Sequence, residues 1–229
     1  MLRIQNLNSG YGNSKVLFDF SLEVGAGEVV TMLGRNGMGK TTAIHTLMGI
    51  VRATAGAVTF KGAAITDMPP HRISRAGLGL VPEGRRITPN LSVEENLLAT
   101  ARGKGPWTLD AVYRFFPRLQ ERKRSMGQQL SGGEQQMLAI SRALMTNPDL
   151  LILDEATEGL APLIRVEIWR CLSELKKQGQ AILVIDKNID ALARIADRHY
   201  IIEKGRAVWS GSSSELLQNN ELRQRYLSV

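Results

Sequence analysis

Cysteine is almost absent from this chain of 229 residues, which contains only Cys171. One cysteine cannot form an internal disulfide, and a zinc site built from several cysteines is likewise excluded. Such cysteine usage fits a reducing compartment. The residues around Cys171 (167–172) have helical periodicity, which predicts a small buried side chain rather than a reactive thiol.

Long apolar runs and aromatic residues are also scarce. No apolar run approaches the ~20 residues that cross a bilayer, and residues 1–7 alternate like a strand, unlike a signal peptide. The net charge is +7, but only 5% of residues are aromatic and no basic stripe is interleaved with them. We therefore expect no nucleic-acid partner. The basic clusters at 118–124 and 223–225 fit either a solvated helix face or a surface near anionic lipid headgroups.

A glycine-rich loop at residues 34–41 fits the pattern G-x-x-x-x-G-K-[ST]. An apolar strand is predicted before it (28–33) and a helix after it (40–49), which is the context that a phosphate-binding loop requires. In such a loop, backbone N–H groups surround phosphate oxygens, the lysine meets the β/γ charge and the threonine hydroxyl reaches Mg²⁺. The predicted nucleotide contacts are Gly34, Asn36, Gly37, Gly39, Lys40, Thr41 and Thr42.

An acidic pair, Asp154 and Glu155, ends the apolar run 150–153. Hydrolysis of a triphosphate needs a positioned metal ion and an oriented water molecule. We expect Asp154 to hold Mg²⁺ together with Thr41, and Glu155 to act as the general base on the attacking water.

The remaining pattern predicts the order of the elements. Segments 2–7 and 16–24 alternate like antiparallel strands around a turn-rich tip at 9–13. Two buried parallel strands joined by a helix are expected near the catalytic residues, and a hairpin followed by a short helix near the C-terminus. The other predicted elements are short strands at 58–60 and 79–81, helices at 93–98, 135–145 and 163–177, strands at 150–153 and 181–185, and the hairpin strands at 200–203 and 207–210.

In the run L-S-G-G-E-Q-Q at residues 130–136, Ser131, Gly132 and Gly133 precede a helix predicted to begin near Glu134. Free N–H groups and the positive end of the helix dipole would let an anion dock there. This run resembles the signature of ATP-binding cassette (ABC) ATPases, which also contain a glycine-rich loop and an acidic pair in this order. The resemblance to that family covers the whole chain. The resemblance implies one α/β domain of residues 1–229. It would contain a P-loop NTPase (RecA-like) core, an antiparallel N-terminal β-subdomain and a helical insert at about 86–147.

Further residue roles follow only from this resemblance. Tyr11 would stack on the adenine of ATP, and Val16 would flank that ring. The signature residues would cap the γ-phosphate of ATP bound to a second subunit, so that two ATP molecules are held between two subunits and hydrolysis lets the subunits separate. These residues are Ser131, Gly132 and Gly133.

Three positions depart from the common ABC pattern. Glu83 stands where glutamine is usual, which makes it a third candidate metal ligand, and Ala161 stands where aspartate is usual. The loops 82–86 and 158–162, with residues 116–119, 133–140 and 226–227, resemble the smaller ATPase of high-affinity branched-chain amino acid importers. Lys187 stands where a γ-phosphate-sensing histidine is expected. Either its ammonium serves catalysis at the γ-phosphate, or it pairs with Asp186 or solvent and a different partner ATPase supplies the faster site.

The resemblance implies an ATP-hydrolysing importer subunit on the cytoplasmic face of the inner membrane. Its partners would be a second ABC ATPase subunit, identical or different, transmembrane permeases and, indirectly, an extracytoplasmic solute-binding protein. The solute would be a branched-chain amino acid or a related small polar molecule. Arg85 and Arg86 are either permease contacts or surface charge. The alternatives are a cassette for export or lipid transport, an ABC ATPase acting on nucleic acid, and a hydrolysis-poor partner subunit.

Overall fold

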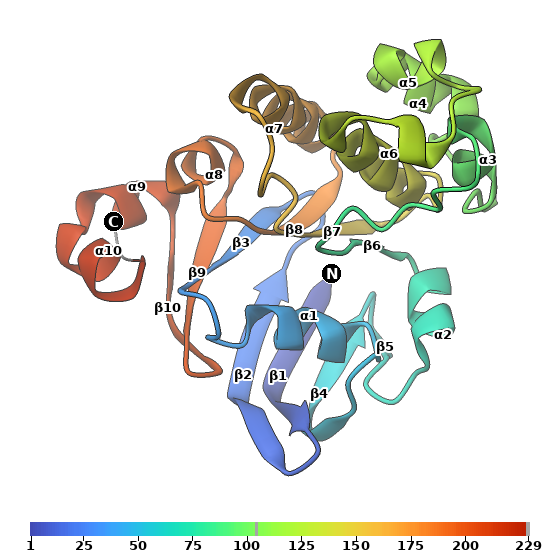
Figure 1. Cartoon of the computed structure of the whole chain (residues 1–229). Coiled ribbons are helices and arrows are strands. Elements are labelled where there is room, and N and C mark those ends of the chain that lie inside the picture. The colour runs from blue at the N-terminus through green and yellow to red at the C-terminus, as the bar shows by residue number, and fades with distance from the viewer. Residues whose placement is uncertain (104, 228–229) are drawn as a thin grey trace.

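The computed structural model describes residues 1–103 and 105–227, which form two sheets (Figure 1). The first is an antiparallel sheet with strand order β2-β1-β4-β5. Its strands are β1 (Leu2–Tyr11), β2 (Ser14–Val24), β4 (Ala53–Phe60) and β5 (Ala63–Ala64). This is the N-terminal sheet that the alternating pattern predicted.

The turn between β1 and β2 is shorter than predicted. The sequence indicated a tip at residues 9–13, but β1 continues to Tyr11, which pairs with Ser14. Only Gly12 and Asn13 remain in the turn, and Gly12 has a φ of 55°. Gly10 lies so close to the backbone of the opposite strand that a β-carbon there would overlap it. The small residues that suggested a loop therefore allow close strand pairing instead.

The second sheet has strand order β10-β9-β3-β8-β7-β6. Its strands are β3 (Val29–Leu33), β6 (Leu78–Val81), β7 (Leu150–Asp154), β8 (Ala181–Ile185), β9 (Arg198–Glu203) and β10 (Arg206–Gly211). Neighbouring strands from β9 to β6 are parallel, and β10 is antiparallel to β9. Every residue of β3, β7 and β8 is buried, which confirms the prediction made from their continuous apolar sequences.

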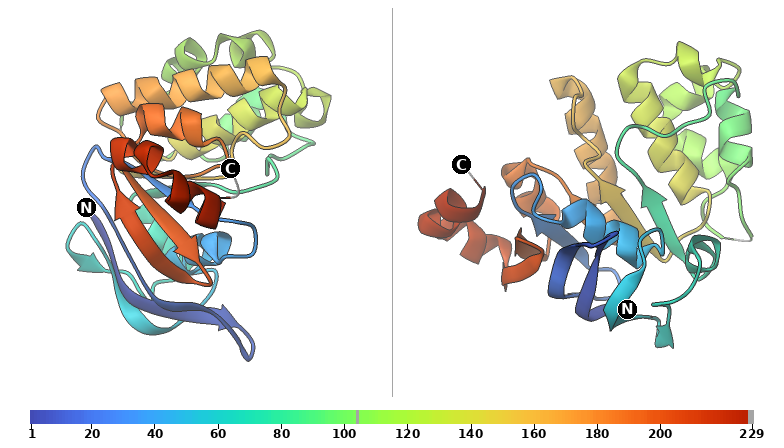
Figure 2. Two further views of the ribbon diagram at one scale, coloured as in Figure 1. Left: turned by 90° about the vertical axis from the view of Figure 1, so that its left-hand side faces the viewer. Right: turned by 60° about the horizontal axis from the view of Figure 1, so that its bottom comes forward.

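Helices lie between consecutive strands of the second sheet, except between β9 and β10, which follow each other directly. Between β6 and β7 lie α3 (Val93–Leu98), α4 (Leu109–Phe115), α5 (Pro117–Glu121), the 3₁₀ turn η1 (Gly127–Gln129) and α6 (Gly132–Leu144). The other helices are α1 (Lys40–Leu47), α2 (Pro70–Arg75), α7 (Pro162–Lys177), α8 (Ile189–Ile195), α9 (Ser213–Gln218) and α10 (Asn220–Leu227). Figure 1 and the right-hand view of Figure 2 place α3 to α6 and the C-terminal helices on opposite sides of the molecule. Across residues 1–103 and 105–227, no helix is both long and apolar enough to cross a membrane.

Alternate residues of the parallel strands enter two cores, one on each face of the second sheet. Leu151, Leu153 and Ile182 face the core that contains α6 and α7. Leu150 and Ile152 face the other core, which contains α1 and the antiparallel sheet. Cys171 is buried in the first core, and burial raises the pKa of its thiol, as expected of an inert side chain.

His199 lies fully buried between β3 and α9. Its Nδ1 is 2.7 Å from Thr31 Oγ1 and its Nε2 is 2.9 Å from Ser213 Oγ. Burial lowers the pKa of His199 to about 4 from an ordinary value of 6.5.

The free energy of unfolding should therefore fall as the pH drops from 6.5 towards 4, because in this window the unfolded chain binds a proton that the folded chain does not. The full loss from His199 is about 3 kcal/mol, and its contribution is fully present above pH ~6.5. Urea unfolding across this range should show a shallower pH dependence for His199→Gln than for the wild type. His71→Gln, which changes an exposed histidine, is the control. Equal slopes for His199→Gln and the wild type would contradict this prediction.

Candidate nucleotide site

The glycine-rich loop leaves β3 after Leu33 and enters α1 at Lys40. Gly34 has a φ of 143° and Gly39 a φ of 101°, values that favour glycine. A β-carbon on Gly34 would also overlap the carbonyl oxygen of Ile202 in β9. The loop is therefore tight, and a side chain at Gly34 would push its backbone away from β9.

Lys40 is enclosed by this loop, with 7% of its surface exposed. Its Nζ donates hydrogen bonds to the carbonyl oxygens of Gly34, at 2.8 Å, and Arg35, at 2.9 Å. Burial lowers the pKa of Lys40, while the negative charges of Glu155 and Asp154 act in the opposite direction. A cation is thus held at the base of the loop, where a phosphate group would approach.

The loop and the ends of the parallel strands enclose a cavity of about 330 Å³. Every lining residue except Glu158 was predicted from the sequence as a site residue. The lining consists of Val16, Asn36, Gly37, Gly39, Lys40, Thr41, Thr42, Glu83, Glu155, Glu158 and Lys187. Residues from five separate parts of the chain therefore meet around a space bordered by both cationic and anionic groups.

Asp154 ends β7 and is 2% exposed. Among the described residues, none forms a hydrogen bond with its Oδ1. Burial raises the pKa of Asp154 and the charge of Glu83 adds to the rise, whereas the Thr41 hydroxyl lowers it. A buried carboxylate oxygen without a partner, beside a hydroxyl, fits a hard cation such as Mg²⁺, which prefers oxygen ligands.

Glu155 follows with the left-handed φ of 51°, and its backbone N–H donates to the carbonyl oxygen of Ile185 in β8. A hydrogen bond shared with Glu158, together with burial, raises the pKa of Glu155 to about 7, while Lys187 opposes the rise. Its carboxylate oxygens lie near those of Glu83 and Glu158, all within 4.8 Å of one another. The carboxyl predicted as the general base therefore has a proton affinity suited to proton transfer near neutral pH.

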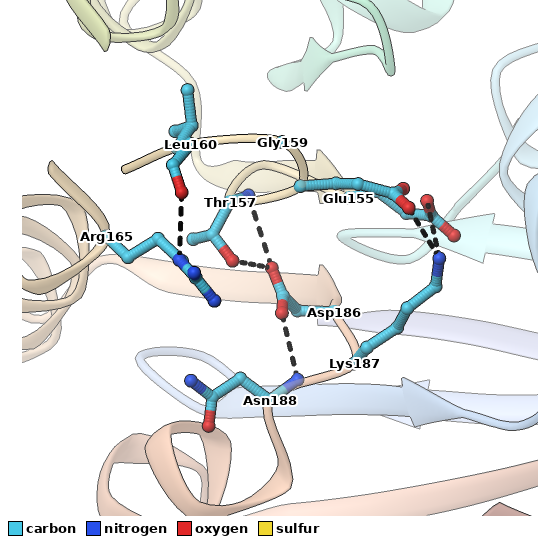
Figure 3. A pocket seen from close by; sticks show the side chains of 9 residues that line it. Glu155, Thr157, Gly159, Leu160, Arg165, Asp186, Lys187 and Asn188 are labelled. Atoms are coloured by element: carbon cyan, nitrogen blue, oxygen red, sulfur yellow. Dashed lines mark hydrogen bonds and ion pairs between the residues drawn. The ribbon is translucent and has the colours of Figure 1, made fainter. Parts of the chain in front are cut away.

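Lys187 pairs with Glu158, so the Asp186 pairing that was one of the alternatives does not form. The Lys187 Nζ lies 2.6 Å from Glu158 Oε1 and 3.9 Å from Glu155 Oε2 (Figure 3). Asp186 instead accepts hydrogen bonds from Thr157 and from the backbone N–H of Asn188. The ammonium of Lys187 therefore borders the cavity while remaining half-exposed.

Two further predicted site residues, Tyr11 and Gly34, lie outside the cavity lining. Tyr11 is 51% exposed at the end of β1, and its hydroxyl is 3.4 Å from His45 Nδ1. Gly34 forms the entry to the loop rather than its inner surface. Neither position contradicts a contact with bound nucleotide, and both contacts stay predictions.

The signature residues Ser131, Gly132 and Gly133 form the start of α6, which begins at Gly132, two residues before the predicted start near Glu134. Ser131 caps the helix, accepting from Glu134 N while its own N–H donates to Glu134 Oε2. Within the described chain these residues do not line the cavity. Their position agrees with a role towards a second subunit, which remains a prediction.

A strand–glycine loop–helix unit that starts from β3, together with the acidic end of the parallel strand β7 two positions along the same sheet, defines the class of P-loop nucleotide hydrolases. A family model described as ABC transporter matches residues 17–158. The chain belongs to this family and is an ABC-type ATPase. This finding confirms the family and fold class indicated by the sequence.

Three comparisons with known proteins illustrate the similarity. The chain is 40% identical to the high-affinity branched-chain amino acid transport ATP-binding protein BraG of Pseudomonas aeruginosa, across 99% of both chains. It is 34% identical to the lipopolysaccharide export system ATP-binding protein LptB of Escherichia coli, across 99% of this chain and 96% of LptB. A solved ATP-binding subunit of an ABC transporter has a TM-score of 0.85 with 29% identity, across 100% of this chain and 96% of that one.

Proposed function

We propose that this chain powers an importer of branched-chain amino acids or of a related small polar solute. The observation that carries the proposal is the 40% identity to BraG along nearly the whole of both chains. The loops 82–86 and 158–162 support the same assignment, because they carry Glu83 and Ala161 where other ABC ATPases usually differ. The similarity to LptB favours one alternative, a lipid exporter.

Our proposal for the site is that the cavity binds the triphosphate of ATP. The loop N–H groups and Lys40 neutralise the β- and γ-phosphate oxygens, and Tyr11 and Val16 contact the adenine. Thr41 and Asp154, with Glu83 as the third candidate, would hold Mg²⁺, which adds positive charge at the phosphates when bound. Glu155 takes a proton from the attacking water.

We further propose that the working unit is a pair of such ATPase subunits. In this arrangement Ser131, Gly132 and Gly133 of each subunit approach the nucleotide of the other, because helix N–H groups stabilise phosphate charge. The whole chain acts as one ABC domain whose helical insert is about 86–147. The pair would lie at the cytoplasmic face of the membrane, bound to permeases that are supplied by a solute-binding protein.

The importer proposal can be tested on the native complex. The tagged chain should be purified from its host membranes with its bound partners, reconstituted in liposomes and assayed for ATPase activity. An importer should co-purify with permeases, and a co-encoded binding protein loaded with leucine or a related small solute should stimulate ATP hydrolysis. Stimulation by lipid alone, with no response to any loaded binding protein, would support the exporter alternative. The same complex containing Glu155→Gln is the control for activity from contaminants.

The pH dependence of hydrolysis tests the general-base assignment. Because the base must be ionised, kcat/KM for ATP should rise with pH through about 7, the pKa of Glu155. Glu158→Gln removes the neighbouring carboxylate that raises this pKa, so the rising limb should move to lower pH. Lys187→Ala removes the charge that opposes the rise, so the limb should move to higher pH. Identical limbs in all three proteins would remove Glu155 from the proton transfer.

We propose that Lys187 acts on the γ-phosphate, where most ABC ATPases use histidine. Its Nζ borders the cavity beside Glu155 and Glu158 and is accessible from the site. ATP turnover of Lys187→Ala should fall, and Lys187→His should recover part of the rate. An unchanged rate in both variants would show that Lys187 has no part in the mechanism.

A further inference from the structure

Arg85 has an unusual position in the loop between β6 and α3. Its φ is 52°, in the left-handed region that few residues other than glycine adopt. Its side chain is half-buried, whereas the neighbouring Arg86 is exposed. The same loop carries Glu83, which lines the nucleotide cavity.

The guanidinium of Arg85 lies between two other segments of the chain. Its Nη2 donates a hydrogen bond to the carbonyl oxygen of Gly159, at 3.2 Å. A β-carbon on Gly132 would overlap Nη1, and one on Gly159 would lie 3.4 Å from Nη2. Arg85 therefore fills the space that a side chain would occupy at Gly132, at the start of α6, and it also contacts the loop after Glu155 at Gly159.

Electrostatics alone would not place the guanidinium here. The N-terminal end of α6 carries the positive end of the helix dipole, which repels a cation. Throughout residues 1–103 and 105–227, no carboxylate lies within 4.0 Å of Arg85 to form an ion pair. The hydrogen bond to the Gly159 carbonyl holds the guanidinium in this position, and the absence of a side chain at Gly132 leaves room for it.

We propose that Arg85 is a positioning residue that fixes the signature end of α6 to the loop after Glu155. The inference rests on the proposed pair of subunits, in which these two segments serve different nucleotides. Gly132 approaches the ATP of the partner, whereas Glu155 acts on the ATP of its own subunit. One planar group that contacts both segments transmits a displacement of either one to the other, and the two nucleotide sites are coupled through it.

The side chains of Arg85 and Arg86 lie in different surroundings. Both were candidate permease contacts, but the guanidinium of Arg85 is directed to Gly159 inside the subunit. Arg86 contributes its carbonyl oxygen to Arg142 Nη1, at 3.2 Å, while its side chain is exposed. Arg86 is therefore the matched control: the same residue type, one position away, without the contact.

Hydrogen exchange followed by mass spectrometry tests the link in the full-length subunit. Arg85→Ala should accelerate amide exchange in both 131–134 and 158–161, because each segment loses the group that holds it. Exchange in the phosphate loop (34–41) should stay unchanged, which shows that the variant is folded. Arg85→Lys should restore part of the protection, and Arg86→Ala should match the wild type in all three segments. If residues 131–134 and 158–161 of Arg85→Ala exchanged their amide hydrogens at the wild-type rate, the proposal would be overturned.

ATP hydrolysis tests the coupling. Arg85→Ala should lower kcat by roughly 10- to 100-fold, with little change in KM and a Hill coefficient for ATP closer to one. Normal kcat and cooperativity in Arg85→Ala would refute the coupling even if exchange were faster. Failure of the wild type to hydrolyse ATP would refute the proposed function instead, and the exchange experiment would still decide whether Arg85 links the two segments.

Discussion

Replacing Glu155 by glutamine is expected to lower kcat for ATP hydrolysis by roughly 10²- to 10⁴-fold, the range that general-base catalysis contributes. Glutamine keeps the size of the side chain but cannot accept the proton of the attacking water. ATP binding should remain, because Lys40 and the loop N–H groups are unaffected. The rate should be measured as phosphate release at saturating ATP, with binding measured separately by calorimetry.

Glu174→Gln is the matched control for this variant, because it makes the same chemical change on an exposed face of α7. Its kcat should equal that of the wild type. A Glu155→Gln protein that hydrolyses ATP at the wild-type rate would show that another group activates the water. Glu158, which shares a hydrogen bond with Glu155, would then be the first alternative.

Replacing Lys40 by alanine should weaken ATP binding by on the order of 10- to 100-fold, since hydrogen bonds to charged groups contribute about 1.5–3 kcal/mol each. The substitution removes the buried ammonium and also leaves the carbonyl oxygens of Gly34 and Arg35 without their donor. The dissociation constant should be measured by calorimetry with ATP and with ADP, and far-UV circular dichroism should confirm that the fold is retained.

Lys177→Ala removes an exposed lysine at the end of α7 and controls for the change in net charge. Its affinity for ATP should be that of the wild type. An unaltered dissociation constant in Lys40→Ala would contradict the assignment of the glycine-rich loop as the phosphate site.

Features encoded over short stretches were predictable from the sequence. The buried strands β7 and β8 are continuous apolar segments of four or five residues, a length that favours a buried strand over a helix. The phosphate loop was recognisable because its glycines, lysine and threonine occupy fixed positions between a strand and a helix. The end of β1 was mistaken for a turn, since local composition does not reveal that Gly10 faces the backbone of another strand.

Contacts between distant segments were not predictable in the same way. Lys187 and Glu158 are 29 residues apart and meet only because β7 and β8 run side by side in the same direction. One sequence feature could have indicated that Glu158 lies near Glu155. Glu158 is a further carboxylate only three positions after Glu155, at the acidic end of β7. The inward contact of Arg85 depends on its left-handed backbone and on space beside Gly132, neither of which is visible in the sequence.

Light scattering of Glu155→Gln with ATP and Mg²⁺ tests the central claim most directly. Two subunits that hold ATP between them without hydrolysing it should have twice the mass of one subunit. The same protein with ADP, or Glu155→Gln combined with Lys40→Ala in ATP, should elute as single subunits. A mass that does not respond to ATP in Glu155→Gln would contradict the account, in which nucleotide bound at the loop joins the subunits and its hydrolysis separates them.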